Sequence, residues 1–222
     1  MSEERNLIIV TGFGPFLGHE EVNASWEAVQ MLPNEVNYQG VDYIVEKRLV
    51  PVEYRAVDEA VTEIWERQPL LVIHCGVSGV AKCVYVEKLA YNHKFRRPDN
   101  TGQYLPNGSI SLPHHNKNNV LFCGLNIDKI VDVVNSEYNE CTAEAAPPYI
   151  NNQKMQATKV SKNVGSFLCG YIYIKSLDIS KERSLFVHVP PIDTPFTKFQ
   201  TGDILLKIIK QCIQQVVACN QK

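Results

Sequence analysis

Residues 161–191 read SKNVGSFLCGYIYIKSLDISKERSLFVHVPP, and from this turn, helix and strand we infer the fold of the chain. A turn at 162–165 leads into an apolar segment that continues to Leu177 and is too long for a strand. The segment predicts a buried helix that is entered through Gly165. The run 185–191 predicts a buried strand that ends at two prolines.

Two side chains of this stretch are candidates for catalysis. Cys169 falls in the first turns of the predicted helix, where unpaired N–H groups and the helix dipole favour a reactive thiolate. His188 lies near the carboxyl end of the predicted strand, where open α/β sheets gather catalytic groups. Most free cysteines only pack in cores, and most histidines at strand ends are ordinary surface or core groups. The spacing of the two residues therefore does not decide between these readings.

Composition narrows the class of protein. The chain has 222 residues, of which 45% are hydrophobic, so we expect one domain over residues 1–222 with a sizeable core. The net charge of −2 and the pI near 6.3 show no excess of basic residues, so no nucleic-acid partner is expected.

The cysteine pattern and the lack of long apolar runs bear on the cellular location of the protein. The seven cysteines are odd in number and show no CxxC spacing, in a chain large enough to fold without disulfides. The polar start, MSEERN, is followed by only four apolar residues, and no run is long enough to span a membrane. We expect reduced thiols, a cytoplasmic location and no membrane partner.

Strand and helix patterns alternate along the rest of the chain. Apolar runs at 7–11, 41–50 and 70–75 predict strands, and a helical stripe follows Pro51. Further helices are expected after a cap at Asn23 or Ser25, at 125–138, and after a cap at Thr201. The alternation indicates an α/β domain with a mainly parallel sheet covered on both faces.

Two glycine-bearing turns follow predicted strands, at 12–16 and 76–79. Both are expected at the carboxyl edge of the sheet. The first contains Phe13 and Phe16, which either fill the core or form the wall of a small apolar pocket.

A predicted strand at 83–89 places Glu87 in a mostly apolar row. A buried carboxylate is costly without a partner, so either this face is solvated or Glu87 pairs with a group such as an imidazole. The polar stretch 92–119 that follows is too long for a simple connection and is a candidate lid or contact arm. Its adjacent histidines, His114 and His115, lack the spacing of a helical metal site and receive no role.

Several motifs in order resemble the pyroglutamyl peptidase I family, also called pyrrolidone-carboxylate peptidases, over almost the whole chain. They are TGFGPF at 11–16, VNASW at 22–26, PVEY at 51–54, GVSG at 76–79, Glu87, GSFLC at 165–169 and HVPP at 188–191. Each motif is weak alone, but their order and spacing together are specific. Their forms are similar to the animal members more than to the bacterial ones.

The resemblance implies a three-layer α/β/α sandwich around a mainly parallel mixed sheet. It implies a cytosolic cysteine peptidase that removes N-terminal pyroglutamate from small peptides and needs no metal or cofactor. In this family pattern Cys169 is the nucleophile, His188 the general base and later acid, and Glu87 the group that orients the imidazole. The substrate pocket is matched by Phe13, Phe16, Val77, Phe167 and Leu168. The family includes monomers and homo-oligomers, and the sequence leaves both open.

The chain departs from the family pattern near the expected site. Bacterial members usually carry arginines at the places of Ala81 and Lys88, and the residue after the nucleophile, commonly Asn or Asp, is Gly170. Val164 replaces a small alanine. These changes motivate a second hypothesis, a catalytically impaired protein of the same fold that binds pyroglutamyl peptides. A nucleotide loop at GFGPF is a weaker alternative, because the motif lacks the last glycine of the dinucleotide fingerprint and has no P-loop lysine.

Overall fold

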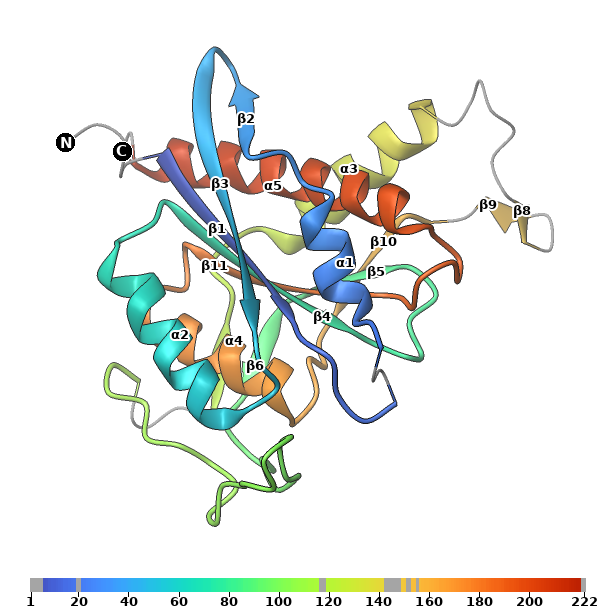
Figure 1. Ribbon diagram of the computed structural model, residues 1–222. Coiled ribbons are helices and arrows are strands. Elements are labelled where there is room, and N and C mark those ends of the chain that lie inside the picture. The colour runs from blue at the N-terminus through green and yellow to red at the C-terminus, as the bar shows by residue number, and fades with distance from the viewer. Residues whose placement is uncertain are drawn as a thin grey trace.

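The computed structural model describes residues 6–18, 21–115, 119–141, 149–150, 153–154 and 156–220. In this part of the chain five helices surround a mixed sheet of seven strands (Figure 1). The helices are α1 (Ala24–Gln30), α2 (Tyr54–Glu66), α3 (Ile127–Cys141), α4 (Leu168–Ile179) and α5 (Lys198–Asn220). The sheet strands are β1 (Leu7–Phe13), β2 (Glu35–Tyr38), β3 (Val41–Val50), β4 (Leu71–Val77), β5 (Val84–Glu87), β10 (Thr158–Ser161) and β11 (Ser184–Val189). Two small hairpin sheets pair β6 (Leu89–Tyr91) with β7 (Val120–Phe122), and β8 (Tyr149–Ile150) with β9 (Gln153–Lys154).

The strand order of the main sheet is β10-β5-β11-β4-β1-β3-β2. The four central strands β11, β4, β1 and β3 are parallel, so their carboxyl ends meet at one edge. Strand β5 is antiparallel to β11, and β2 is antiparallel to β3. The sheet is therefore mainly parallel but mixed, as predicted.

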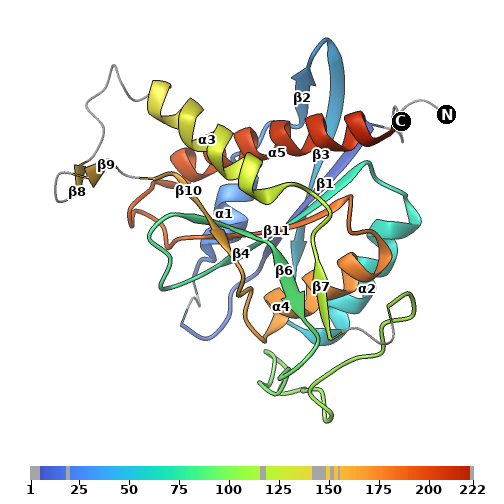
Figure 2. The same ribbon diagram turned by 180° about the vertical axis from the view of Figure 1, so that it is seen from behind.

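Helices cover both faces of this sheet and form the outer layers of the sandwich (Figures 1 and 2). In β1, Leu7 and Ile9 belong to the core on the side of α2 and α4, whereas Ile8 and Val10 belong to the core on the side of α1, α3 and α5. Alternate residues of a strand point to opposite faces, so a continuous apolar run fills two cores at once. The three-layer architecture is confirmed.

Most of the predicted elements are present. The helix after Pro51, the strand at 41–50 and the helix and strand of residues 161–191 are confirmed. The helix at 125–138 is shifted to Ile127–Cys141, and β1 and β4 each extend two residues further than expected. Strands β2 and β7 were not predicted.

Two predictions were wrong in detail. The strand expected at 83–89 leaves the main sheet after Glu87, because residues 89–91 pair with β7 instead. The last helix begins at Lys198, so Thr201 lies inside it. Its start is a capping box in which Thr197 Oγ1 accepts the Gln200 N–H at 3.2 Å and Gln200 Oε1 accepts the Thr197 N–H at 3.0 Å.

The stretch 92–119 contains no helix or strand among its described residues and lies beside the α2 and α4 layer, in green in Figure 1. His115 anchors it, with Nδ1 3.0 Å from Oδ1 of the buried Asp178 on α4. A role of this loop as a lid stays a prediction.

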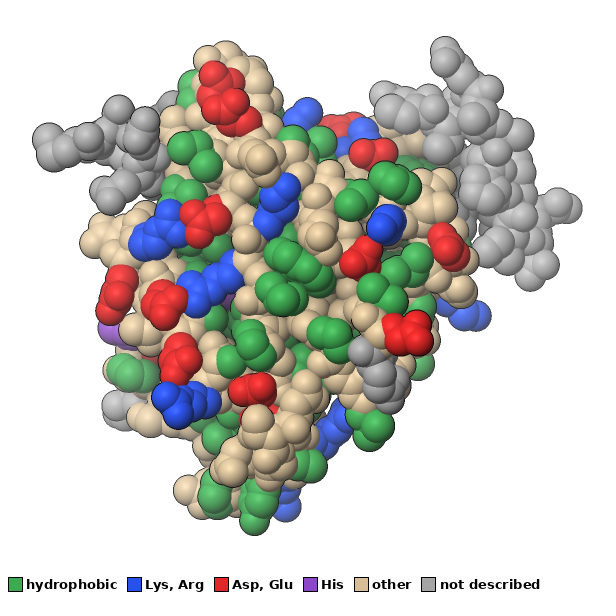
Figure 3. All heavy atoms as spheres, in the orientation of Figure 1, with side chains coloured by type: hydrophobic (Ala, Val, Ile, Leu, Met, Phe, Trp, Pro, Cys, Tyr) green, Lys and Arg blue, Asp and Glu red, His purple; other side chains and the backbone are tan. Residues whose placement is uncertain are grey.

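None of the described helices combines the length and the apolar character that crossing a bilayer requires. On the face in Figure 3, acidic and basic side chains are interspersed rather than gathered by sign.

A buried histidine on the sheet forms hydrogen bonds with a neighbouring strand and with α4. His74 on β4 is fully buried, with Nδ1 2.8 Å from Thr11 Oγ1 and Nε2 2.7 Å from Ser176 Oγ. Trp65 Nε1 donates to the same Ser176 oxygen at 3.1 Å. Burial lowers the pKa of His74 to about 3. The ring is therefore neutral in the folded protein at neutral and mildly acidic pH.

We expect this histidine to make folding weaker in acid. Between pH 6.5 and about 3 the unfolded chain binds a proton on His74 that the folded protein excludes, so stability falls as the pH falls through this window. The loss has a limiting slope of about 1.4 kcal/mol per pH unit. Urea unfolding at pH 7, 6 and 5 measures this slope, and His74→Gln should remove it. Equal slopes in the two proteins would contradict the assignment.

Candidate active site

Cys169 is the second residue of α4, as predicted from the turn and the apolar run that precede and follow it. Gly165 makes the turn with a φ of 78°, and Phe167 is the N-cap without a side-chain cap bond. The first backbone bond of the helix runs from the Tyr171 N–H to the Phe167 carbonyl. Among the described residues, no protein group accepts the N–H of Cys169, which therefore points to a position where an anion is favoured.

The sulfur of Cys169 lies directly against strand β4. A Cβ built on Gly76 would be 2.8 Å from this sulfur and 2.9 Å from Cζ of Phe186. Contacts this short are forbidden for a real side chain, so only glycine at position 76 leaves room for the thiol. The glycine of the second predicted turn thus has a packing reason at the site.

His188 and Glu87 meet on the α4 side of the sheet. In the antiparallel pairing of β11 and β5, Glu87 is opposite Phe186, and His188 is two residues further along on the same face. Glu87 Oε1 accepts a hydrogen bond from His188 Nδ1 at 2.8 Å. Glu87 is fully buried and His188 is 7% exposed. Of the two alternatives for Glu87, the imidazole partner is correct and the solvated face is wrong.

The histidine also reaches the thiol. The pKa of His188 is raised to about 9: burial by itself lowers it, but hydrogen bonds with Cys169 and Glu87 and the negative charge of these groups outweigh burial. The structure thus brings Cys169, His188 and Glu87 into one hydrogen-bonded chain. In such a chain the carboxylate fixes the ring, and the ring can take or return the proton of the thiol.

A small apolar pocket opens next to the sulfur. It is lined by Phe13, Phe16, Asn23, Val52, Val77, Phe167, Leu168 and Cys169. All five residues that the resemblance assigned to the substrate pocket line it. Phe13 also belongs to the core on the α2 and α4 side, so both interpretations apply to this residue. A flat, uncharged ring fits such a lining better than a charged group does.

Sequence reasoning missed Asn23 and Val52 as pocket residues. Asn23 was interpreted only as a helix cap, which it is, with Oδ1 3.0 Å from the Ser25 N–H. Its Nδ2 also donates to the Gly14 carbonyl at 2.9 Å, and Ser25 Oγ accepts the Phe13 N–H at 3.1 Å. The cap therefore holds the aromatic turn in place. Val52 follows the carboxyl end of β3, and its position at that edge was the available signal.

The other described thiols are in surroundings unlike that of Cys169. Burial raises the pKa of Cys83 and Cys123 to about 11, and that of Cys75 and Cys212 further. Such thiols are inert, whereas the half-buried Cys169 contacts an imidazole. No group of three or more His, Cys, Asp or Glu side chains suited to a metal is found among the residues that the structure describes.

The departures from the family pattern have structural explanations. A Cβ on Gly170 would lie 2.2 Å from the Gly165 carbonyl oxygen, so the turn before α4 packs too closely for Asn or Asp. Val164 is buried in the core on the α2 and α4 side. Lys88 does not face the site but pairs with Asp128 on α3 at 2.6 Å. Ala81 is buried.

Comparisons with known proteins identify the family of this chain. The family model described as "Pyroglutamyl peptidase" matches residues 6–218. Pyroglutamyl-peptidase 1 of Homo sapiens is 34% identical over 96% of this chain and 92% of its own, and the pyrrolidone-carboxylate peptidase of Thermococcus onnurineus is 32% identical over 82% of each. The crystal structure of Bacillus amyloliquefaciens pyroglutamyl peptidase I has the same fold, with a TM-score of 0.76 at 23% identity over 96% of this chain and 98% of that one.

The match to the family model covers nearly all of the chain, and the human relative exceeds 30% identity over almost the same length. The animal character of the motifs fits the human, rat and mouse relatives, which are 33–34% identical. The chain therefore belongs to the pyroglutamyl peptidase family and is a cysteine-type omega peptidase.

Proposed function

We propose that this protein removes N-terminal pyroglutamate from small peptides through an acyl-enzyme formed on Cys169. The observation that carries the proposal is the chain from Glu87 through His188 to Cys169, which ends beside an apolar pocket. Pyroglutamate is a small uncharged lactam, so the phenylalanines of the pocket can contact its ring by face and edge. A free N-terminal glutamate or glutamine would bring charge into this pocket and leave polar groups unpaired.

The reaction begins with attack of the Cys169 thiolate on the carbonyl that joins pyroglutamate to the next residue. The N–H groups at the start of α4 are the proposed donors to the oxyanion of the tetrahedral intermediate. His188, as an imidazolium, gives its proton to the departing amine, and the C–N bond breaks to leave a thioester. Water then attacks the thioester while the neutral imidazole accepts its proton, and free pyroglutamate is released.

In this mechanism Glu87 orients the ring and stabilises the imidazolium. The raised pKa of His188 supports this role, because the ring keeps its proton up to about pH 9. The chemistry needs only a thiol, a base and an oriented carboxylate, so the proposal includes no metal and no cofactor.

The wider setting is part of the same proposal. All six described cysteines are free, which supports a reducing compartment such as the cytoplasm. The organisation of residues 1–222 as one domain remains a prediction, supported by a sheet that combines strands from the first and last thirds of the chain. Nucleic-acid and membrane partners are not expected, and the chain acts as a monomer or homo-oligomer.

The first prediction concerns the nucleophile and the substrate ring. The reduced protein should release a fluorescent amine from a pyroglutamyl amide but not from a prolyl amide, and Cys169→Ala should abolish this turnover. Cys219→Ala is the control, because this thiol is exposed on α5. A folded, reduced protein that binds pyroglutamate without turnover would instead support the impaired binding protein.

The second prediction is a shift of the pH profile in Glu87→Gln. Without the carboxylate the pKa of His188 should fall from about 9, so the basic limb of kcat/KM should move to lower pH. We expect a loss of about 100-fold or more in kcat, since the ring loses its orienting charge. Rates between pH 5 and 10 measure both effects, with the exposed Glu66→Gln as control. An unchanged basic limb would exclude this role of Glu87.

The third prediction tests the contact between sulfur and sheet. Gly76→Ala should displace the Cys169 sulfur and lower kcat by about 100-fold, because a displacement of roughly 1 Å from reacting geometry has a cost of this size. Gly79→Ala, whose new Cβ meets nothing within 4 Å, should keep full activity. Activity is compared after circular dichroism shows that both variants are folded. Equal activity of the two variants would contradict the packing argument.

A further inference from the structure

Residues 97–100 of the long loop are tied to the substrate pocket. Asn100 Nδ2 donates to the Pro15 carbonyl in the aromatic turn at 2.9 Å, and the Asn100 N–H donates to the Val52 carbonyl at 3.0 Å. At the start of α2, Tyr54 donates its O–H to the Arg97 carbonyl at 3.1 Å and its N–H to Asp99 Oδ2 at 2.8 Å. This part of the loop is therefore fixed against the pocket wall.

Arg97 places a cation on the outer side of that wall. Its guanidinium carbon is 4.5 Å from the ring centroid of Phe167, a pocket residue two positions before Cys169. The Arg97 side chain is exposed. Among the described ion pairs, none involves Arg97. A guanidinium stacked on an aromatic ring keeps its N–H fork free for a planar anion.

The mouth of the pocket lies on the same side. Phe13, Leu168 and Val52 are buried and form its inner walls. Phe16, Phe167 and Cys169 are partly exposed, so the pocket opens between them. When the lactam of a substrate lies inside the pocket and its reacting carbonyl lies at the sulfur, the rest of the peptide must leave the pocket between these partly exposed residues. The first and second residues beyond the reacting bond then lie within about 7 Å of it, near Phe167 and its cation.

We propose that Arg97 is a specificity-determining residue that binds a carboxylate on the one or two residues following pyroglutamate. The inference rests on the proposed function and adds a preference for short peptides. In a pyroglutamyl dipeptide or tripeptide the C-terminal carboxylate is at this place, and in a longer peptide only an acidic side chain can take it. Arginine binds a carboxylate through two parallel N–H···O bonds, which a neutral carboxamide cannot reproduce.

The test compares binding of acid and amide forms by calorimetry in a Cys169→Ala protein, which does not consume them. The first pair is pyroglutamyl-alanine and pyroglutamyl-alaninamide, which probe the C-terminal carboxylate. The second pair is the α-amides of pyroglutamyl-glutamate and pyroglutamyl-glutamine, which probe the side chain. In each pair we expect the acid to bind roughly tenfold more tightly. A preference in only one pair identifies the source of the carboxylate.

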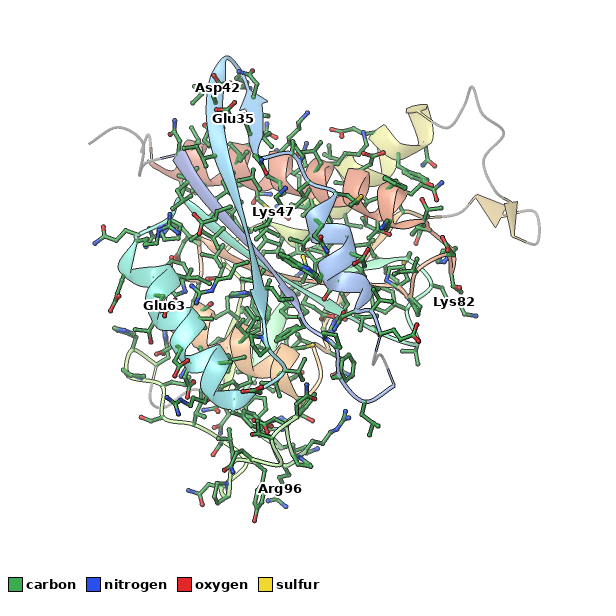
Figure 4. All side chains as sticks on the ribbon, in the orientation of Figure 1. Glu35, Asp42, Lys47, Glu63, Lys82 and Arg96 are labelled. Carbon is green, nitrogen blue, oxygen red and sulfur yellow. The ribbon has the colours of Figure 1, made fainter. Side chains whose placement is uncertain are left out.

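Arg96 offers a matched control for the charge. It is the neighbouring arginine, and Figure 4 places it on the long loop at the outer edge of the molecule. Its Nε would be 3.1 Å from a Cβ on Gly108, so its side chain lies over that glycine. Arg97→Gln should bring the ratio of acid to amide affinity close to one, Arg97→Lys should keep part of it, and Arg96→Gln should keep all of it. The preference should also shrink as salt is added.

Two results would overturn the assignment. The first is equal affinity for acid and amide in both pairs, and the second is a ratio in Arg97→Gln that equals that of the starting protein. If the intact protein still hydrolyses a neutral pyroglutamyl amide, either result removes only the role of Arg97. If it hydrolyses no pyroglutamyl substrate and binds none of these peptides, the proposed function fails and this inference fails with it.

Discussion

The hydrogen bond between buried Glu87 and His188 is the constraint on which the site depends. A fully buried carboxylate is stable only with a partner, and the imidazole that pairs with it has its pKa raised to about 9. The two groups meet because the register of β5 against β11 pairs Glu87 with Phe186, and His188 lies two residues further along on the same face. The Glu87–His188 pair therefore depends on the register between β5 and β11.

Close backbone packing is the second constraint, and it explains where the chain departs from its family. The Cys169 sulfur fits against β4 only because residue 76 is a glycine, and the turn before α4 fits only because residue 170 is one. In the sequence alone, Gly170 beside Cys169, the expected nucleophile, suggested a catalytically impaired protein. In the structure the Gly165 carbonyl occupies the place where a Cβ would be. The packing of this turn therefore requires glycine at position 170.

Sequence patterns predicted the elements well and their partners less well. Long periodic or continuous apolar segments, such as those of α2, α4 and β11, are determined by their own residues. Short strands such as β2 and β7 depend on the strand beside them, which no local pattern reveals. The pairing of β5 with β11 and the roles of Asn23 and Val52 at the pocket also depend on contacts between distant segments. The helix cap predicted at Thr201 was wrong for a different reason. An earlier threonine, Thr197, caps the helix through a capping box with Gln200.

Two histidines on one face of the sheet show how the surroundings of a ring determine its charge state. His74 pairs with Phe186 across β4 and β11, and His188 is two residues beyond that position. Both rings are buried, and burial by itself lowers the pKa of each. Among the described residues, the hydrogen-bond partners of His74 are the hydroxyls of Thr11 and Ser176, so burial determines its pKa and the ring stays neutral. His188 contacts Glu87 and Cys169. Their hydrogen bonds and negative charge outweigh the effect of burial on its pKa, so the ring carries a proton. The same side chain is fixed in one charge state where its partners are neutral hydroxyls, and it can exchange a proton where its partners are themselves ionisable.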